Sequence, residues 1–151
     1  MLRLSKKLLF AIEAVLDIAY HAGSEPVQSR EITKRQRIPR RYLEQVLQQL
    51  VRTGILRGVR GPKGGYLLAR ERSRITIGEI TRVIHAMETA ANPIEDPAGS
   101  ELGHKVVRPL WEEVRNDVMT RLDSVTVEDL CLRAHKEGLE SEAHRQLDFT
   151  I

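Results

Sequence analysis

Residues 29–69 read SREITKRQRIPRRYLEQVLQQLVRTGILRGVRGPKGGYLLA, and this stretch decides the fold. Its first half predicts a short helix over 29–35 and a turn over 36–38. A longer helix over 39–53 follows, opened by Pro39, because proline is favoured in the first helical turn. Two helices joined by so short a turn are typical of a helix-turn-helix.

The second half of the stretch predicts a β-hairpin. Two short apolar runs, 55–59 and 66–69, flank the Gly- and Pro-rich segment 60–65. A helix-turn-helix followed by a hairpin with a basic tip is the layout of a winged DNA-binding module. The sequence therefore predicts a mainly α fold with a small β-hairpin wing.

The charges are unevenly distributed along the chain. Residues 30–74 hold 13 Lys and Arg against 3 Asp and Glu, a net charge of +10, whereas residues 75–151 hold 8 against 15, a net charge of −7. A basic block usually marks a solvated surface. On a helix-turn-helix pattern it favours binding to nucleic acid, the commonest large polyanion.

Composition excludes several protein classes. With 41% hydrophobic residues the chain can bury a core, and 151 residues suit one small domain with an appended interface element. Aromatic residues, at 4%, are too few for a base-stacking platform for single strands. One cysteine excludes an internal disulfide. The N-terminal apolar run 8–12 is too short for a signal peptide or a membrane span, so we expect a cytoplasmic protein.

The chain divides into four parts. We expect a DNA-binding domain over 1–88, a loop over 89–103, dimerisation helices over 104–138 and a flexible tail over 139–151. Ser5 is expected to cap the first helix, whose core face is formed by Leu8, Ile12, Val15, Leu16 and Ala19.

A long C-terminal helix carries an apolar stripe that is wide for the edge of so small a domain. Such a stripe is best buried against a second copy of the chain. Pro109 lies either in the first turn of this helix or at a kink. The predicted dimer interface comprises Val107, Leu110, Trp111, Val114, Val118 and Leu122.

The helix over 39–53 should read DNA bases in the major groove. Arg suits guanine, Gln suits adenine, and Glu suits the amino group of cytosine. For Glu44 three interpretations stay open: it reads a cytosine, it holds a neighbouring Arg in position, or it is a surface residue paired with Arg40. The candidate readers are Arg40, Arg41, Tyr42, Glu44, Gln45 and Gln48.

Two other elements should contact the DNA backbone and the minor groove. Arg30 and Lys34, four residues apart on the preceding helix, suit phosphates. At the wing tip, Arg60 suits the minor groove, where negative potential is high. The remaining wing candidates are Gly61, Lys63 and Gly64. The spacing does not fit a nucleotide-binding P-loop, and a strand rather than a helix follows.

These residues resemble a known family. The run 38–47, the glycine-rich segment 59–69, Thr76-Ile77-Gly78-Glu79-Ile80, Leu110-Trp111 and 123–130 are similar to the Rrf2 family of bacterial transcription regulators. The RGPKGGY wing is the sharpest marker. The resemblance implies a winged helix-turn-helix, a homodimer formed through the long C-terminal helix, and binding to a palindromic operator.

The sequence departs from that family at one place. Many members hold an iron–sulfur cluster with three cysteines in the loop before the dimerisation helix, but residues 90–104 contain no cysteine. Because thiolates hold such clusters, we expect no iron–sulfur cluster and no other metal. The chain resembles cluster-free members, some of which respond to a partner protein or a small-molecule signal.

The remaining reactive side chains give weak signals. Cys131, between two leucines, suits a buried apolar position, although a one-cysteine redox switch or a metal site with His135 stays open. No nucleophile–base pair stands out, so we expect no enzyme.

Two function classes remain. The first is a sequence-specific DNA-binding repressor that acts as a homodimer on double-stranded DNA. The second is an adaptor that docks a partner enzyme through its acidic C-terminal half. Salt-sensitive binding to a palindrome discriminates between them.

Overall fold

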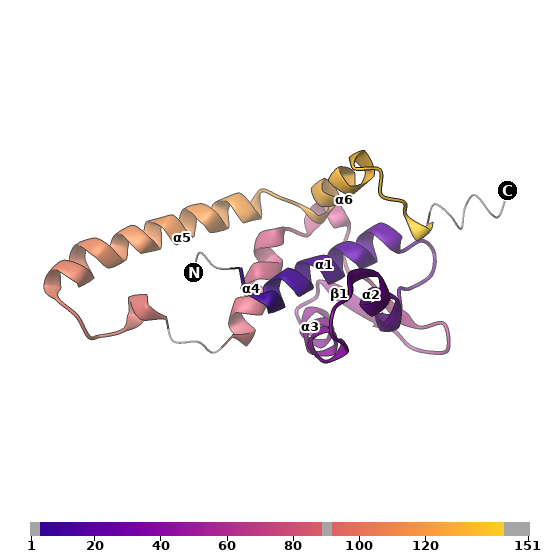
Figure 1. Cartoon of the computed structure of the whole chain (residues 1–151), viewed down its shortest axis with the longest axis horizontal. Coiled ribbons are helices and arrows are strands. Elements are labelled where there is room, and N and C mark those ends of the chain that lie inside the picture. Colours follow the sequence, from indigo (N-terminus) through magenta and orange to yellow (C-terminus); the bar gives the residue numbers. More distant parts are fainter. Residues whose placement is uncertain (1–3, 89–91, 144–151) are drawn as a thin grey trace.

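The computed structural model describes residues 4–88 and 92–143. It shows a helical head from which one long helix projects, so that the molecule is elongated (Figure 1). The head holds four helices and a hairpin: α1 (Lys6–His21), α2 (Ser29–Gln36), α3 (Arg40–Arg52), β1 (Leu56–Val59), β2 (Gly65–Leu68) and α4 (Ile77–Met87). The other elements are η1 (Arg72–Arg74), η2 (Pro93–Glu95), the π-helical turn η3 (Gly103–Val107), α5 (Arg108–Asp123) and α6 (Val127–Lys136).

Helix α1 is the centre of the head. Its apolar face packs against α2, α3, α4 and α6, and Ala11, Ala14, Val15 and Ile18 are completely buried. Ser5 caps the helix as predicted, because its hydroxyl accepts a hydrogen bond from the Leu8 amide at 3.1 Å. An apolar helix surrounded by four others needs no long-range sheet to form a core.

The helix-turn-helix has the predicted core. Ile32 of α2 and Ile38 of the turn are buried between the two helices. Helix α2 begins at Ser29, but its N-cap is Gln28 rather than Ser29, since the Gln28 amide donates to the Glu31 carboxylate at 2.8 Å. The stripe of α3 is fully buried, as the spacing predicts, at Leu43, Val46, Leu47 and Leu50.

An ion pair that the sequence analysis did not predict joins α1 to α2. The Asp17 side chain is fully buried, and both its oxygens accept from Arg35, from Nη2 at 2.8 Å and from Nε at 2.9 Å. Gln36 Nε2 donates to the same carboxylate at 2.8 Å. The hydrogen bond to Asp17 raises the pKa of the Arg35 guanidinium. A buried carboxylate with three charge-assisted or amide donors is well compensated for its lost hydration.

The hairpin is held to the head by its own backbone. Strands β1 and β2 are antiparallel, with Leu56 opposite Leu68 and Val59 opposite Gly65. Val27, in the segment after α1, extends this pairing, because its amide donates to the Tyr66 carbonyl at 3.0 Å and its carbonyl accepts a hydrogen bond from the Tyr66 amide at 2.8 Å. The mainly α fold with a two-stranded wing is thus confirmed.

Two capped helices determine where α5 leaves the head. Thr76 caps α4 and Thr126 caps α6, each in a capping box, and the segments before the two helices are bridged by backbone hydrogen bonds. Asp123, at the end of α5, pairs with Arg82 of α4 through two 2.7 Å bonds, and this pairing lowers the pKa of the Asp123 carboxyl.

The start of the long helix differs from the expectation of one continuous helix. Residues Gly103–Val107 form a π-helical turn, and the α-helix proper begins at Arg108 with Pro109 in its first turn. Proline has no amide hydrogen to donate, so the regular α-helical pattern is interrupted immediately before it. Of the two alternatives for Pro109, the first-turn position is therefore correct.

The first residues of the expected tail, 139–143, are described, and several of them contact the end of α1. The Tyr20 hydroxyl donates to the Leu139 carbonyl, Ser141 Oγ donates to the Tyr20 carbonyl at 2.5 Å, and the Glu142 amide donates to His21 Nδ1 at 3.1 Å. The chain up to this point is therefore fastened to the end of α1. The rest of the predicted tail, 144–151, lies outside the described residues.

Replacing Asp17 tests the buried ion pair. We expect Asp17→Ala to lower the free energy of unfolding by about 3 kcal/mol, because Arg35 and Gln36 lose their acceptor. The control is Glu71→Ala, because the exposed Glu71 carboxylate lies as far as 3.9 Å from Arg74 Nε. Loss of this weak surface pair should change the free energy of unfolding by less than about 0.5 kcal/mol. Urea denaturation at fixed protein concentration measures both; a loss below about 1 kcal/mol for Asp17→Ala would contradict this role.

Candidate nucleic-acid interface

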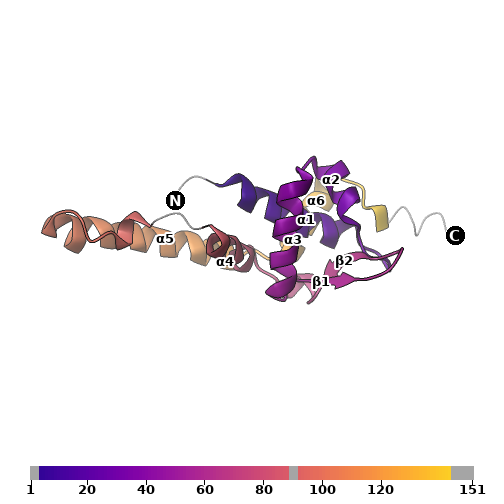
Figure 2. The ribbon, with the colours of Figure 1, turned by 90° about the horizontal axis from the view of Figure 1, so that it is seen from below.

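Helix α2, helix α3 and the wing contribute to one face of the head. In Figure 2, α3 runs across α1 toward the β1–β2 hairpin. A hollow of about 560 Å³ lies between the start of α2, the first turn of α3 and the wing tip. Its wall includes Arg30 and Arg40 from the two helices and Gly61, Pro62 and Gly64 from the wing. An open hollow next to these arginines is suited to a phosphate backbone.

The predicted readers of α3 are all exposed. Since the buried stripe turns the opposite side of α3 to the core, its polar side chains point outward from the head. They are Arg40, Arg41, Tyr42, Glu44, Gln45 and Gln48.

Three of these side chains have partners within the protein. Arg40 Nε donates to Glu44 Oε1 at 2.9 Å, so Glu44 is engaged by an arginine in the same helix face. This geometry favours a role for Glu44 in holding Arg40 over a role as an independent base reader. The Tyr42 ring lies 6.2 Å from the Phe10 ring of α1, and Tyr42 nevertheless remains 44% exposed.

The basic residues of α2 divide into two groups. Arg30 and Lys34 are exposed, as their predicted contact with phosphates requires. Arg35 points inward to Asp17 and is not available to DNA. Arg37, in the turn, is exposed and is the one non-glycine residue with positive φ in the described chain, at 53°. Arg37 was not among the predicted DNA-binding residues, although a basic residue in the turn before α3 is in a position typical of a phosphate contact.

The wing depends on glycines for close backbone contact. A Cβ atom at Gly65 would lie 2.4 Å from the Val27 carbonyl oxygen, and one at Gly64 would lie 2.2 Å from the Val59 oxygen. Gly61 has a φ of 112°, which side chains rarely adopt. These contacts leave Arg60 and Lys63 exposed at the wing tip.

The stripe of α5 is largely uncovered in the single chain. Val107, Leu110, Trp111 and Val118 are between 41% and 56% exposed, whereas Val114 is half-buried. Leu122 differs from the rest, because it packs against the core of the head. Two residues that the sequence analysis did not include, Leu102 and Val106, are also exposed, at 68% and 59%.

The segment before α5 is held by Arg108. Its guanidinium donates to the carbonyls of Asp96 and Ala98, and its Nη1 lies 2.9 Å from His104 Nδ1. His104 Nε2 is 3.2 Å from the Pro97 carbonyl. The Arg108 guanidinium and the His104 imidazole therefore hold residues 96–98 beside the start of the long helix.

Cys131 is buried in α6, at 4% exposure. Burial raises the pKa of its thiol, which disfavours the thiolate. The position therefore agrees with the apolar interpretation of this cysteine.

The sequence of this chain is similar to a known protein family over most of its length. A sequence model of the Rrf2 family, described as "Iron-dependent Transcriptional regulator", matches residues 4–133. The chain belongs to the Rrf2 family. Members are transcription regulators with a winged-helix fold, and this membership confirms that the chain is a regulator and not an enzyme.

Individual Rrf2 relatives agree along most of the chain. The HTH-type transcriptional regulator IscR of Xenorhabdus nematophila is 33% identical over 130 residues, which cover 85% of this chain and 79% of that protein. The structure of T. potens IscR has a TM-score of 0.75 at 31% identity and covers 93% of each chain. The structure of CymR, titled the global cysteine regulator of B. subtilis, has a TM-score of 0.70 at 32% identity, over 88% of this chain and 98% of that one.

The residues of this Rrf2 chain do not fit an iron–sulfur cluster. The sequence from 90 to 104 has no cysteine, and the one cysteine of the chain is buried in α6. Within 4–88 and 92–143, no group of three or more His, Cys, Asp or Glu side chains could hold a metal ion. Across the same residues, no helix is long and apolar enough to cross a bilayer.

A glycine replacement tests the anchor of the wing. We expect Gly65→Ala to destabilise the fold by about 2 kcal/mol, because the added methyl group would meet the Val27 backbone. Hydrogen exchange at the Val27 and Tyr66 amides should accelerate with it. The matched control is Gly58→Ala in β1, where a Cβ would meet nothing within 4 Å. Equal exchange rates in the two variants would contradict the proposed close contact.

Proposed function

We propose that this Rrf2 regulator represses transcription by binding a palindromic operator as a homodimer. The observation that carries the proposal is the common face on which the polar side of α3, the cations of α2 and the basic wing lie, in a segment with a net charge of +10. Because a bound dimer at a promoter obstructs the polymerase, repression is its simplest consequence. We place the protein in the cytoplasm, where its operator would be.

Each element has a distinct role in this proposal. Helix α3 enters the major groove with its N-terminal half, where Arg40 and Arg41 meet base edges or phosphates. Arg30, Lys34 and Arg37 neutralise the flanking phosphates. The wing places Arg60 in the adjacent minor groove, and Lys63 adds charge beside it.

The dimer supplies the second half of the reading surface. Exposed apolar residues on three turns of α5 need a partner, and a second α5 offers the same chemistry. A two-fold axis through this helix pair would present two copies of α3 to a palindrome.

Affinity for a palindrome at several salt concentrations tests DNA binding. We expect Kd to rise steeply with salt, because several phosphates are neutralised. Arg60→Ala should weaken binding about tenfold, reduce the salt slope by about one and lower the preference for A·T pairs near the wing. The control Lys136→Ala, on exposed α6, should change none of these. Salt-independent or absent binding to its own promoter region would instead favour an adaptor that docks a partner enzyme.

Charged residues in the stripe test the dimer. The double variant Leu110→Glu and Val118→Glu should be monomeric at micromolar concentration and bind the operator at least tenfold more weakly, because carboxylates would face each other in the interface. The control is Asn116→Glu, which adds one carboxylate at an exposed position of α5 outside the stripe. Light scattering reports the mass; a double variant that stays dimeric would rule out this interface.

Anaerobic purification tests the absence of a cluster. The protein should be colourless and contain neither iron nor acid-labile sulfide, because the segment before α5 offers no thiolate. A brown preparation with stoichiometric iron and sulfide would overturn this part of the proposal.

A further inference from the structure

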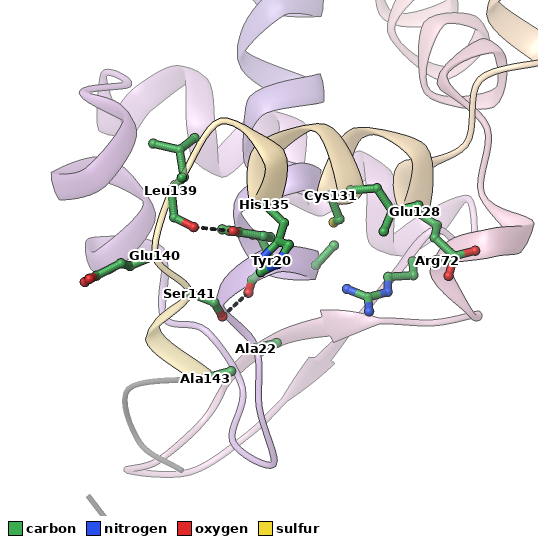
Figure 3. A pocket seen from close by; sticks show the side chains of 13 residues that line it. Tyr20, Ala22, Arg72, Glu128, Cys131, His135, Leu139, Glu140, Ser141 and Ala143 are labelled. Carbon is green, nitrogen blue, oxygen red and sulfur yellow. Dashed lines mark hydrogen bonds between the residues drawn. The ribbon is translucent and has the colours of Figure 1, made fainter. Parts of the chain in front are cut away.

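A second cavity lies on a different part of the head. It has a volume of about 540 Å³ and is enclosed by the end of α1, by α6, by η1 and by the chain from 138 to 143 (Figure 3). This volume is within the range of small-molecule sites. The hydrogen bonds from Tyr20 to Leu139 and from Ser141 to Tyr20 hold the chain after α6 as one of its walls.

The cavity combines an apolar lining with one strong cation. Ala19, Ala22 and Leu132 supply apolar surface. Arg72 lines the cavity from η1, on the side of Cys131 (Figure 3). A thiol is at most a weak acceptor, so the five guanidinium donors remain largely available to a ligand.

Arg72 differs from the two arginines beside it. Arg70 pairs with Glu79 at 3.2 Å, and Arg74 lies 3.9 Å from Glu71. Within the described parts of the chain, Arg72 forms no ion pair with a carboxylate. It is therefore the member of this basic segment that remains available to an anion entering the cavity.

Other lining residues restrict the class of that anion. His135 can donate a second hydrogen bond from the same wall as Cys131 (Figure 3). Glu128 also lines the cavity, and its carboxylate would repel a multiply charged ligand such as a phosphate ester. One arginine, one histidine and an apolar floor suit a monoanion with an apolar body.

We propose that this cavity binds a small monocarboxylate, with the carboxylate on Arg72 and its hydrocarbon part against Leu132 and the alanines. Arginine binds a carboxylate through two parallel hydrogen bonds, which orients the ligand as well as holding it. Burial of the hydrocarbon part supplies the rest of the affinity.

The walls of the cavity continue into the segments that hold the wing. Ala22 precedes the stretch in which Val27 pairs with Tyr66, and Arg72 follows β2 by four residues. A ligand carboxylate that binds and shifts Arg72 would therefore affect the segments on both sides of the Val27–Tyr66 pairing, which holds the wing. The ligand would thus change operator affinity, an inference that rests on the proposed DNA-binding function.

Calorimetry with octanoate, in the absence of DNA, tests the site by itself. We expect one octanoate per chain with a Kd between about 10 μM and 1 mM, and no binding of octylamine, which has the same chain and the opposite charge. Arg72→Gln should weaken octanoate binding at least tenfold. Arg74→Gln, the matched control on the same short element but outside the cavity, should leave it unchanged.

A second variant keeps the result interpretable if Arg72→Gln affects folding. Leu132 is 55% exposed at the cavity wall, so Leu132→Glu should fold normally and repel the carboxylate. Absence of octanoate binding, equal binding of octylamine, or equal affinity in both cavity variants and the control would overturn the proposal.

The link to the wing is tested separately with the operator. Saturating octanoate should change the operator Kd of the unmodified protein at least threefold and that of Arg72→Gln not at all. Octanoate binding without any change in operator affinity would overturn the link and leave the site. If the unmodified protein binds octanoate but no operator even in the absence of octanoate, the proposed DNA-binding function is contradicted and the cavity site stands.

Discussion

The position of the whole reading surface depends on the buried contact between Asp17 and Arg35. A carboxylate inside a helical core would be costly, but here three donors from α2 surround it. The contact fixes the orientation of α2 on α1. The single buried apolar side chain of α2, Ile32, would not by itself prevent α2 from rotating about its axis. Since a three-residue turn joins α2 to α3, the same contact determines where α3 presents its polar face.

A second constraint acts at the other end of the head. The bridge between the segments before α4 and α6, together with the Arg82–Asp123 pair, fixes the direction in which α5 leaves. Gly78 makes this possible, because a Cβ there would collide with the Asp123 carboxylate at 1.8 Å. In a dimer formed through α5, these contacts would set the distance between the two copies of α3. The separation of operator half-sites would thus be encoded far from the residues that touch DNA.

Features that follow from residue spacing along the chain were predictable from the sequence. Contacts between residues that are far apart in the chain were not. The stripe of α3, the capping box at Thr76 and the glycine-rich wing each follow from local spacing. The ion pair of Asp17 does not, because its partner Arg35 lies 18 residues away and no local pattern joins them. The π-helical turn before Pro109 and the burial of Leu122 against the head likewise depend on tertiary packing. For the interface, the sequence predicted which side chains of α3 are exposed and gave the pairing of Glu44 with Arg40 as one open interpretation, but it did not single out Arg37 beside them.

In the proposed complex, two copies of one reading head contact one palindrome. Hydroxyl-radical footprinting on an operator selected from the source genome can test this arrangement. We expect two equivalent protected regions related by two-fold symmetry, with their centres about 10 base pairs or a multiple of that apart. Additional minor-groove protection by each wing should disappear in Arg60→Ala. A single asymmetric protected region, or none at a concentration that saturates calorimetric binding, would contradict the account.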